Sequence, residues 1–166
     1  MTSSIDIKGV AAIAQALQEL PKRVAKNALR AAVYAGAAVI RDEAKQQAPE
    51  YHGKVRDGHP PPGTLKRALA VKRVQADCTP TREVAQVYVR QAKNGSVGQK
   101  NVKAYGRTDA YYWRWVEFGT SKMAAHPFMR PAFEAKKQAA LEAIVTKLVE
   151  RIEQEALQLN TTGPQA

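Results

Sequence analysis

The sequence predicts an α+β fold, with long N-terminal and C-terminal helices packed on a small antiparallel β-sheet. An alanine-rich stretch with helical spacing lies near the start, two runs rich in β-branched residues lie in the middle, and an aliphatic stripe with helical period lies near the end. Because the helices flank the strands and do not alternate with them, the pattern indicates α+β and not α/β. A length of 166 residues predicts one domain, residues 1–166.

The first third is predicted to form two helices. Residues 9–20 have apolar side chains at helical spacing and predict a short helix. Pro21 suits the first turn of a second helix at about 21–48, and Pro49 ends it. The small residues 35–38 would let another backbone approach closely. The expected apolar face comprises Ala25, Leu29, Ala32, Val33, Ile40 and Ala44.

The middle third combines a hairpin with two loops. Three consecutive prolines and three glycines exclude regular structure from residues 50–64. The β-rich runs 68–74 and 84–91 predict a hairpin connected through residues 77–81. Residues 93–107 are polar and basic. Both loops are expected to be mobile in the isolated protein.

The last third begins with the aromatic segment 109–118 and continues into a helix at about 130–158. Leu141, Ile144, Val145, Leu148, Val149 and Ile152 form its apolar stripe. The tail 159–166 is expected to fray. No signal peptide and no span of about 20 apolar residues is evident, so we expect synthesis in the cytoplasm, without export or membrane insertion.

The residues with catalytic or metal-binding potential are few. Cys78 is the single cysteine, and His52 and His59 lie in a loop without further ligands. There is no phosphate-binding glycine loop and no nucleophile elbow. Asp109 and Glu117 are the one plausible acid pair near the aromatic segment, and charge pairing with Arg107 or Arg114 explains them more simply. We expect no enzyme activity, no metal and no cofactor.

The charge of +11 is concentrated in one part of the chain. Residues 51–107 carry 12 basic and 3 acidic side chains, whereas residues 108–166 carry 7 of each. Such a concentration attracts polyanions or an acidic protein, although a solvated basic surface is the simpler interpretation. The candidate contacts are Lys54, Arg56, Lys93, Lys100, Lys103 and Arg107.

The aromatic segment allows two interpretations. Tyr111, Tyr112, Trp113 and Trp115 lie beside basic residues and could stack on unpaired bases. Large aromatic side chains more often fill a core or anchor a subunit interface, and we favour that interpretation here.

Residues 112–133 resemble a known signature. They read Tyr-Trp-Arg-Trp-Val-Glu-Phe-Gly-Thr-Ser-Lys-Met-Ala-Ala-His-Pro-Phe-Met-Arg-Pro-Ala-Phe. These residues contain, in order, an aromatic segment, Glu-Phe-Gly-Thr, a short spacer and Pro-Phe-hydrophobic-Arg-Pro-Ala. This order resembles the signature of the tail-component family of long-tailed phages of the HK-ninety-seven gp-ten type. Weaker similarity lies in residues 44–49 and 63–67. The long basic loops depart from the family pattern and leave the specific partners open.

The resemblance implies a virion structural protein of a long-tailed phage or prophage. Its role would be tail completion or head–tail joining, as a subunit of a ring, a hexamer, that meets neck and tail-tube proteins and lets double-stranded DNA pass through its lumen. A free nucleic-acid-binding protein is the alternative. The residues implied as a structural motif are Trp113, Trp115, Glu117, Phe118, Gly119, Thr120, Pro127, Phe128, Arg130 and Pro131.

The motif also has a physical interpretation as a rigid corner. Gly119 can adopt a positive φ, and Thr120 or Ser121 can satisfy loop backbone groups. Glu117 is expected to accept backbone N–H bonds or to pair with Arg130. Pro127 and Pro131 restrict φ in the run into the last helix. Phe118, Phe128 and Phe133 are expected to hold that helix on the core.

Overall fold

The computed structural model describes residues 22–50, 60–79, 81–90 and 110–161. The predicted helix at 9–20, most of the loop at 50–64 and the whole loop at 93–107 lie outside these residues. So do the six basic candidates Lys54, Arg56, Lys93, Lys100, Lys103 and Arg107.

The described elements confirm the predicted α+β class. They are α2 (Lys22–Gln47), α3 (Thr64–Ala68), β1 (Leu69–Arg73), the 3-10 turn η1 (Gln75–Asp77), β2 (Ala85–Val89), α4 (Trp113–Phe118) and α5 (Met129–Thr161). The bounds of α2, β1 and β2 agree with the predicted segments to within a few residues. Two details differ. Thr64 begins α3 and is not loop, and α5 continues through Asn160 and Thr161, which were expected to fray.

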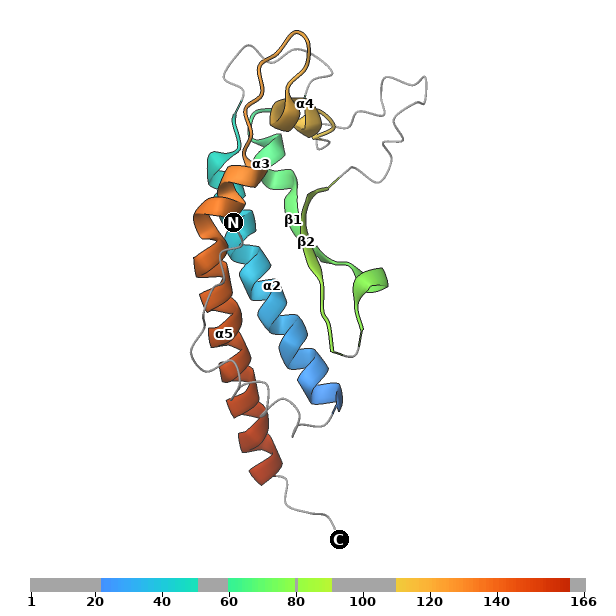
Figure 1. Cartoon of the computed structure of the whole chain (residues 1–166), viewed down its shortest axis with the longest axis vertical. Coiled ribbons are helices and arrows are strands. Elements are labelled where there is room, and N and C mark those ends of the chain that lie inside the picture. The colour runs from blue at the N-terminus through green and yellow to red at the C-terminus, as the bar shows by residue number, and fades with distance from the viewer. Residues whose placement is uncertain (1–21, 51–59, 80, 91–109, 162–166) are drawn as a thin grey trace, which may run out of the picture.

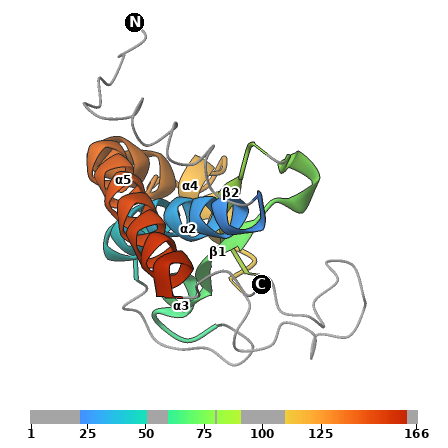
Figure 2. The same ribbon diagram turned by 90° about the horizontal axis from the view of Figure 1, so that it is seen from below.

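The two long helices run side by side in opposite directions, with α2 lying between α5 and the hairpin (Figures 1 and 2). Because α2 is covered on two sides, its buried residues do not form the single expected stripe. Ala32 and Ala44 are buried as predicted, whereas the other four predicted positions are half-buried. Ala28 and Ala37 are buried in addition.

A small-residue contact lets α2 and α5 approach closely. A Cβ built on Gly36 would lie 2.5 Å from Ile144 Cγ1 and 2.8 Å from the backbone oxygen of Ala140. Both distances are shorter than a Cβ contact allows, and the Ala140 oxygen belongs to the backbone, so only glycine fits without a shift of the helices. The prediction that residues 35–38 permit a close helix contact is therefore confirmed at Gly36.

The sheet is a two-stranded antiparallel hairpin. Leu69 pairs with Val89 and Arg73 with Ala85, which confirms the predicted pairing. Short strands of this kind are marginal alone and gain stability by packing on a helix. Here both strands pack on α2, and η1 together with a bridge between Thr79 and Arg82 closes the connection.

The core has two parts. The smaller part lies along the helix pair, where Ala28, Ala32 and Leu148 are buried and Ile144 and Ile152 pack against them. The larger part lies at the end of the helices where α3 and α4 meet them. It comprises Ala44, Ala48, Leu65, Ala68, Leu69, Val89, Ala110, Phe128 and Ala132.

No described helix combines the length and the apolar character that crossing a membrane requires.

Candidate functional site: the corner between α4 and α5

The predicted motif forms a corner at one end of the molecule, where the short helix α4 turns into a loop that leads to α5 (Figure 1). The chain closes the corner with backbone hydrogen bonds. Gly119 N donates to Trp115 O at 2.9 Å, Thr120 N donates to Met123 O at 2.9 Å, and His126 N donates to Val116 O at 2.8 Å. These bonds hold the loop against α4, so the corner is a rigid unit.

Glu117 connects the two sides of the corner. Its carboxylate accepts hydrogen bonds from the backbone N–H groups of Phe128 at 2.8 Å, Met129 at 3.1 Å and Arg130 at 3.3 Å. Pro131 has no N–H, and Ala132 N already donates to Phe128 O at 3.3 Å. A single buried carboxylate from another element therefore satisfies the free donors that begin α5, as an N-cap residue normally does.

This geometry decides between the two expected roles of Glu117. The first role, acceptance of backbone N–H bonds, is confirmed. The second role, pairing with the guanidinium of Arg130, is wrong, because the contact is made by the Arg130 backbone and its side chain is exposed. A carboxylate at a helix N-terminus is also favoured by the helix dipole.

Gly119 makes the turn that the motif requires. Its backbone has φ 73° and ψ 180°, a conformation open essentially to glycine alone. A Cβ at this position would lie 2.9 Å from the backbone nitrogen of Ala125 and 3.0 Å from the oxygen of Met123. Thr120 assists, because its Oγ1 accepts a hydrogen bond from Lys122 N at 3.2 Å. Both expectations for the turn are confirmed.

The three phenylalanines of the motif have different environments. Phe128 is 0% exposed and lies in the larger core cluster, as predicted. Phe118 is 70% exposed and Phe133 is 49% exposed, so the prediction that they hold α5 on the core is wrong. The side chain of Glu117 occupies the inward face of α4, which leaves Phe118, one residue later, on the outward face.

The aromatic segment divides in the same way. Trp113 and Tyr112 are half-buried and pack against the larger core cluster. Burial raises the pKa of the Tyr112 phenol above its ordinary value. Trp115 is 51% exposed, and its ring packs edge-to-face with the Tyr111 ring, with 5.6 Å between the two ring centroids. The core interpretation therefore applies to Tyr112 and Trp113 but not to Trp115.

Two features of the corner were not predicted from the sequence. Helix α3 places the fully buried Thr64 and Leu65 in the core at this end, and Met123 is 39% exposed on the turn. Gly63, with φ 74°, precedes α3 and was the available signal for a helix start there. No sequence pattern distinguishes Met123 from a buried methionine.

The described residues hold no group of three or more His, Cys, Asp or Glu side chains that could bind a metal ion. The polar groups of the corner are hydrogen-bonded within the chain, whereas part of its apolar surface is exposed. The described contacts of the corner hold α4 and α5 together.

Comparison with known proteins identifies the family of this chain. The chain matches the family described as "Bacteriophage HK97-gp10, putative tail-component" over residues 11–119, more than half of its length. The chain belongs to the HK97-gp10 tail-component family. No curated protein and no solved structure gives a significant match. As a member of this family, the chain is a structural protein of the phage tail, a part of the virion that contacts other phage proteins.

The match also sets a boundary within the motif. It includes α2, the hairpin and α4 and stops at Gly119, at the turn of the corner. The resemblance noted for residues 120–133 thus lies beyond the matched range. Those residues are tied to α4 by geometry, chiefly by the three hydrogen bonds that the start of α5 donates to Glu117.

Proposed function

We propose that this HK97-gp10-type protein acts in tail completion or head–tail joining, as one subunit of a ring. Its membership of a tail-component family carries the proposal. The rigid corner supports it, because a joint between protein layers needs a surface whose shape is set before the partner arrives. No step of chemistry is assigned to the protein.

Ring closure places a demand on the surface of the subunit. A ring of identical subunits, which we propose to be a hexamer, requires a heterologous interface in which one patch meets a different patch on the neighbour. The long pair α2 and α5 supplies an extended side for such contacts (Figure 1).

The basic middle of the chain is assigned to the lumen of the ring. Lysine and arginine side chains attract passing double-stranded DNA through its phosphates and read no sequence. The proposed contacts are Lys54, Arg56, Lys93, Lys100, Lys103 and Arg107.

The test removes the gene from the phage and examines the particles by electron microscopy. A role in joining predicts full heads and separate tails, with joining restored when the purified protein is added. Normal particles, or particles without any tail tube, would contradict this role.

A free nucleic-acid-binding protein is the second candidate, favoured by the net charge of +9 in residues 51–107. It predicts tight binding of duplex DNA by the isolated protein at physiological salt, with affinity falling steeply as salt rises. Retention of the protein in purified particles separates the two candidates, since only the first requires it.

A further inference from the structure

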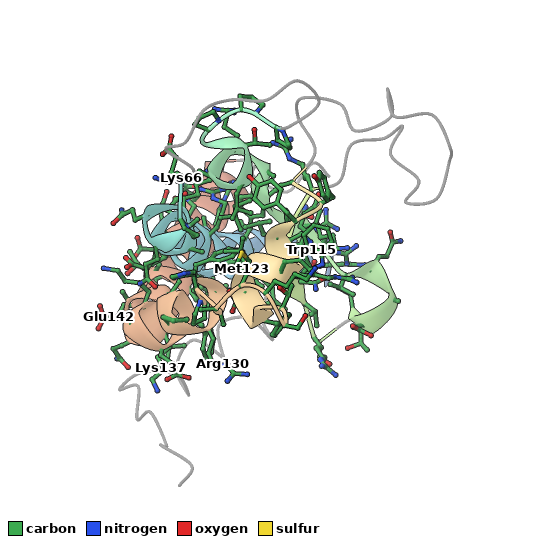
Figure 3. The ribbon with its side chains drawn as sticks, turned by 90° about the horizontal axis from the view of Figure 1, so that it is seen from above. Lys66, Trp115, Met123, Arg130, Lys137 and Glu142 are labelled. Carbon is green, nitrogen blue, oxygen red and sulfur yellow. The ribbon has the colours of Figure 1, made fainter. Side chains whose placement is uncertain are left out.

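The outward side of the corner carries an apolar surface that nothing in the described chain covers. Trp115, Phe118 and Met123 are 51%, 70% and 39% exposed. Trp115 and Phe118 are three residues apart on α4 and therefore neighbours on its surface. Backbone hydrogen bonds link the turn of Met123 to the end of α4, and Figure 3 shows Trp115 and Met123 at this end of the molecule.

Two cations lie close to these side chains along the chain, because Arg114 is four residues before Phe118 on α4 and Lys122 directly precedes Met123. Arg114 lies over the Trp113 ring, 5.5 Å from its centroid, and Lys122 is exposed on the turn. The single acid between residues 110 and 128 is Glu117, which is buried and engaged by the start of α5. We name Arg114, Trp115, Phe118, Lys122 and Met123 the corner surface. It is apolar and positively charged, with no exposed acid of its own.

Its composition is that of a protein interface. Tryptophan, phenylalanine, methionine and arginine are enriched where one protein docks on another, and fixed aromatic side chains contribute most of the binding energy. Trp115 is held by its edge contact with Tyr111, so little side-chain freedom is lost on binding. A positive surface of this kind complements a partner with acidic side chains.

The described part of a second copy of this chain is poorly suited as that partner. Within the described residues the acids are largely engaged in ion pairs, for example Glu83 with Arg73, Glu43 with Lys136 and Glu150 with Lys147. Apart from the buried Glu117, the acids without an ion pair among the described side chains are Asp77, Glu142 and Glu153, and these three form no cluster. Asp77 lies on η1, and Glu142 and Glu153 are about 16 Å apart along α5.

Double-stranded DNA is also poorly suited. Phosphates would satisfy Arg114 and Lys122, but the exposed rings of Trp115 and Phe118 would then face a charged backbone. Stacking on bases requires unpaired nucleotides, which a duplex does not present.

We infer that the corner surface docks an acidic segment with apolar side chains that belongs to a different protein of the tail or neck. This inference rests on the proposed function. Trp115 and Phe118 anchor the apolar side chains of the partner, and Arg114 and Lys122 pair with its carboxylates. The lateral contacts of the ring then use other surfaces, so assembly into a ring and docking of the next layer are separable.

The experiment places a photoreactive side chain on this surface in the full-length protein. Phe118 is replaced with p-benzoylphenylalanine during particle assembly in host cells, and the products of irradiation are mapped by mass spectrometry. Tyr34, an aromatic residue of α2 that is 49% exposed, receives the same replacement as a matched control. Circular dichroism confirms that both proteins fold.

The expected product joins residue 118 to another phage protein, at a peptide with more Asp and Glu than Lys and Arg. The same adduct does not form from position 34. Adding Arg114→Glu and Lys122→Glu lowers its yield by about tenfold or more, because like charges then face each other. A product that joins residue 118 to a second copy or to DNA, or no specific product, overturns the inference.

The same preparation tests the proposed function independently of the docking inference. The protein is detected in purified particles by immunoblot. If it is present in the particles but residue 118 cross-links only to other copies of this chain, the docking inference fails and the proposed function stands. If it is absent from the particles, the proposed function fails first.

Discussion

The carboxylate of Glu117 caps a helix to which Glu117 does not belong. It lies on α4, yet it accepts the hydrogen bonds of three N–H groups at the start of α5. A helix normally caps itself with a residue next to its first turn. Here the capping carboxylate belongs to Glu117, eleven residues before Phe128, and not to His126 or Pro127 just before the helix. The angle between α4 and α5 is thereby tied to one carboxylate.

Replacement of Glu117 tests this dependence. Glu117→Ala leaves buried N–H groups without acceptors, and we expect a loss of about 1–3 kcal/mol in the free energy of unfolding. Glu117→Gln keeps one acceptor oxygen and should lose less. Urea denaturation measures both. Glu142→Gln, an exposed change on α5, is the control, and equal stability of Glu117→Ala and this control would contradict the capping role.

Phe128 and Phe133 form a matched pair on the same stretch of chain. Phe128→Ala should cost about 3–5 kcal/mol, because a fully buried ring leaves a cavity. Phe133→Ala should change stability by about 0.5 kcal/mol or less, because that ring is half exposed. Thermal unfolding of both variants is the measurement. Similar losses for the two would show that Phe133 supports the core after all.

Gly119 and Gly63 offer a second matched pair. Both have positive φ, but Gly63 has ψ 1° and lies in the left-handed helical region, which other residues adopt rarely but more often than the conformation of Gly119. Gly119 has ψ 180°. We expect Gly119→Ala to cost about 1–3 kcal/mol and Gly63→Ala to cost less, as measured by urea denaturation. The reverse order would mean that the corner relaxes around an added Cβ.

At the scale of elements, the hairpin is attached to α2 by charge as well as by packing. Arg73 on β1 forms a bidentate pair with Glu83, and Arg30 on α2 lies 3.8 Å from the same carboxylate. The Glu83 side chain is 3% exposed, so it depends on these partners. The hydrogen bond from Arg73 holds the pKa of Glu83 below its ordinary value.

This pair predicts a pH dependence. Because the pKa of Glu83 is lower in the folded state than in the unfolded chain, its contribution is fully present above the ordinary carboxyl pKa of about 4.3 and is lost as pH falls through the lower, folded-state pKa. Arg73→Met should therefore flatten the acid decline of the urea midpoint between pH 7 and pH 3. Lys137→Met, which removes an exposed pair with Glu134, is the control. Parallel declines for Arg73→Met and the wild type would contradict the prediction.

At the scale of the whole molecule, the excess positive charge is expected to act during assembly. Reversal of four of the six basic candidates, Lys54→Glu, Arg56→Glu, Lys93→Glu and Lys103→Glu, should reduce the yield of infectious particles if these residues line the lumen or meet an acidic partner. Plaque counts and electron microscopy are the measurements. Unchanged heads, tails and infectivity would mean that these residues are only solvated surface.

Much of the architecture was predictable from local pattern. Helical periodicity located α2 and α5, and alternating β-branched runs located β1 and β2, because each pattern depends on neighbours along the chain. The same applies to Gly119, whose turn follows from the chemistry of glycine. The likeness of residues 112–119 to a tail-component signature was likewise visible in the residues themselves, and it agrees with the family match.

The direction in which individual side chains point was not predictable. Phe118 and Phe133 are as apolar as Phe128, and only packing decides which ring is enclosed. Burial depends on what lies opposite in space, and that comes from elements distant in sequence. The position of α2 between α5 and the hairpin explains why its buried residues form two faces.

Residue type and spacing were enough to predict the elements, the corner-forming glycine and the concentration of charge. The capping of α5 by Glu117 and the exposure of Trp115, Phe118 and Met123 became evident only in the folded chain. A hydrogen bond between residues eleven apart requires the folded chain to bring them together. Whether an aromatic side chain is exposed depends on which other elements pack over it, and the residues next to it in sequence do not show this.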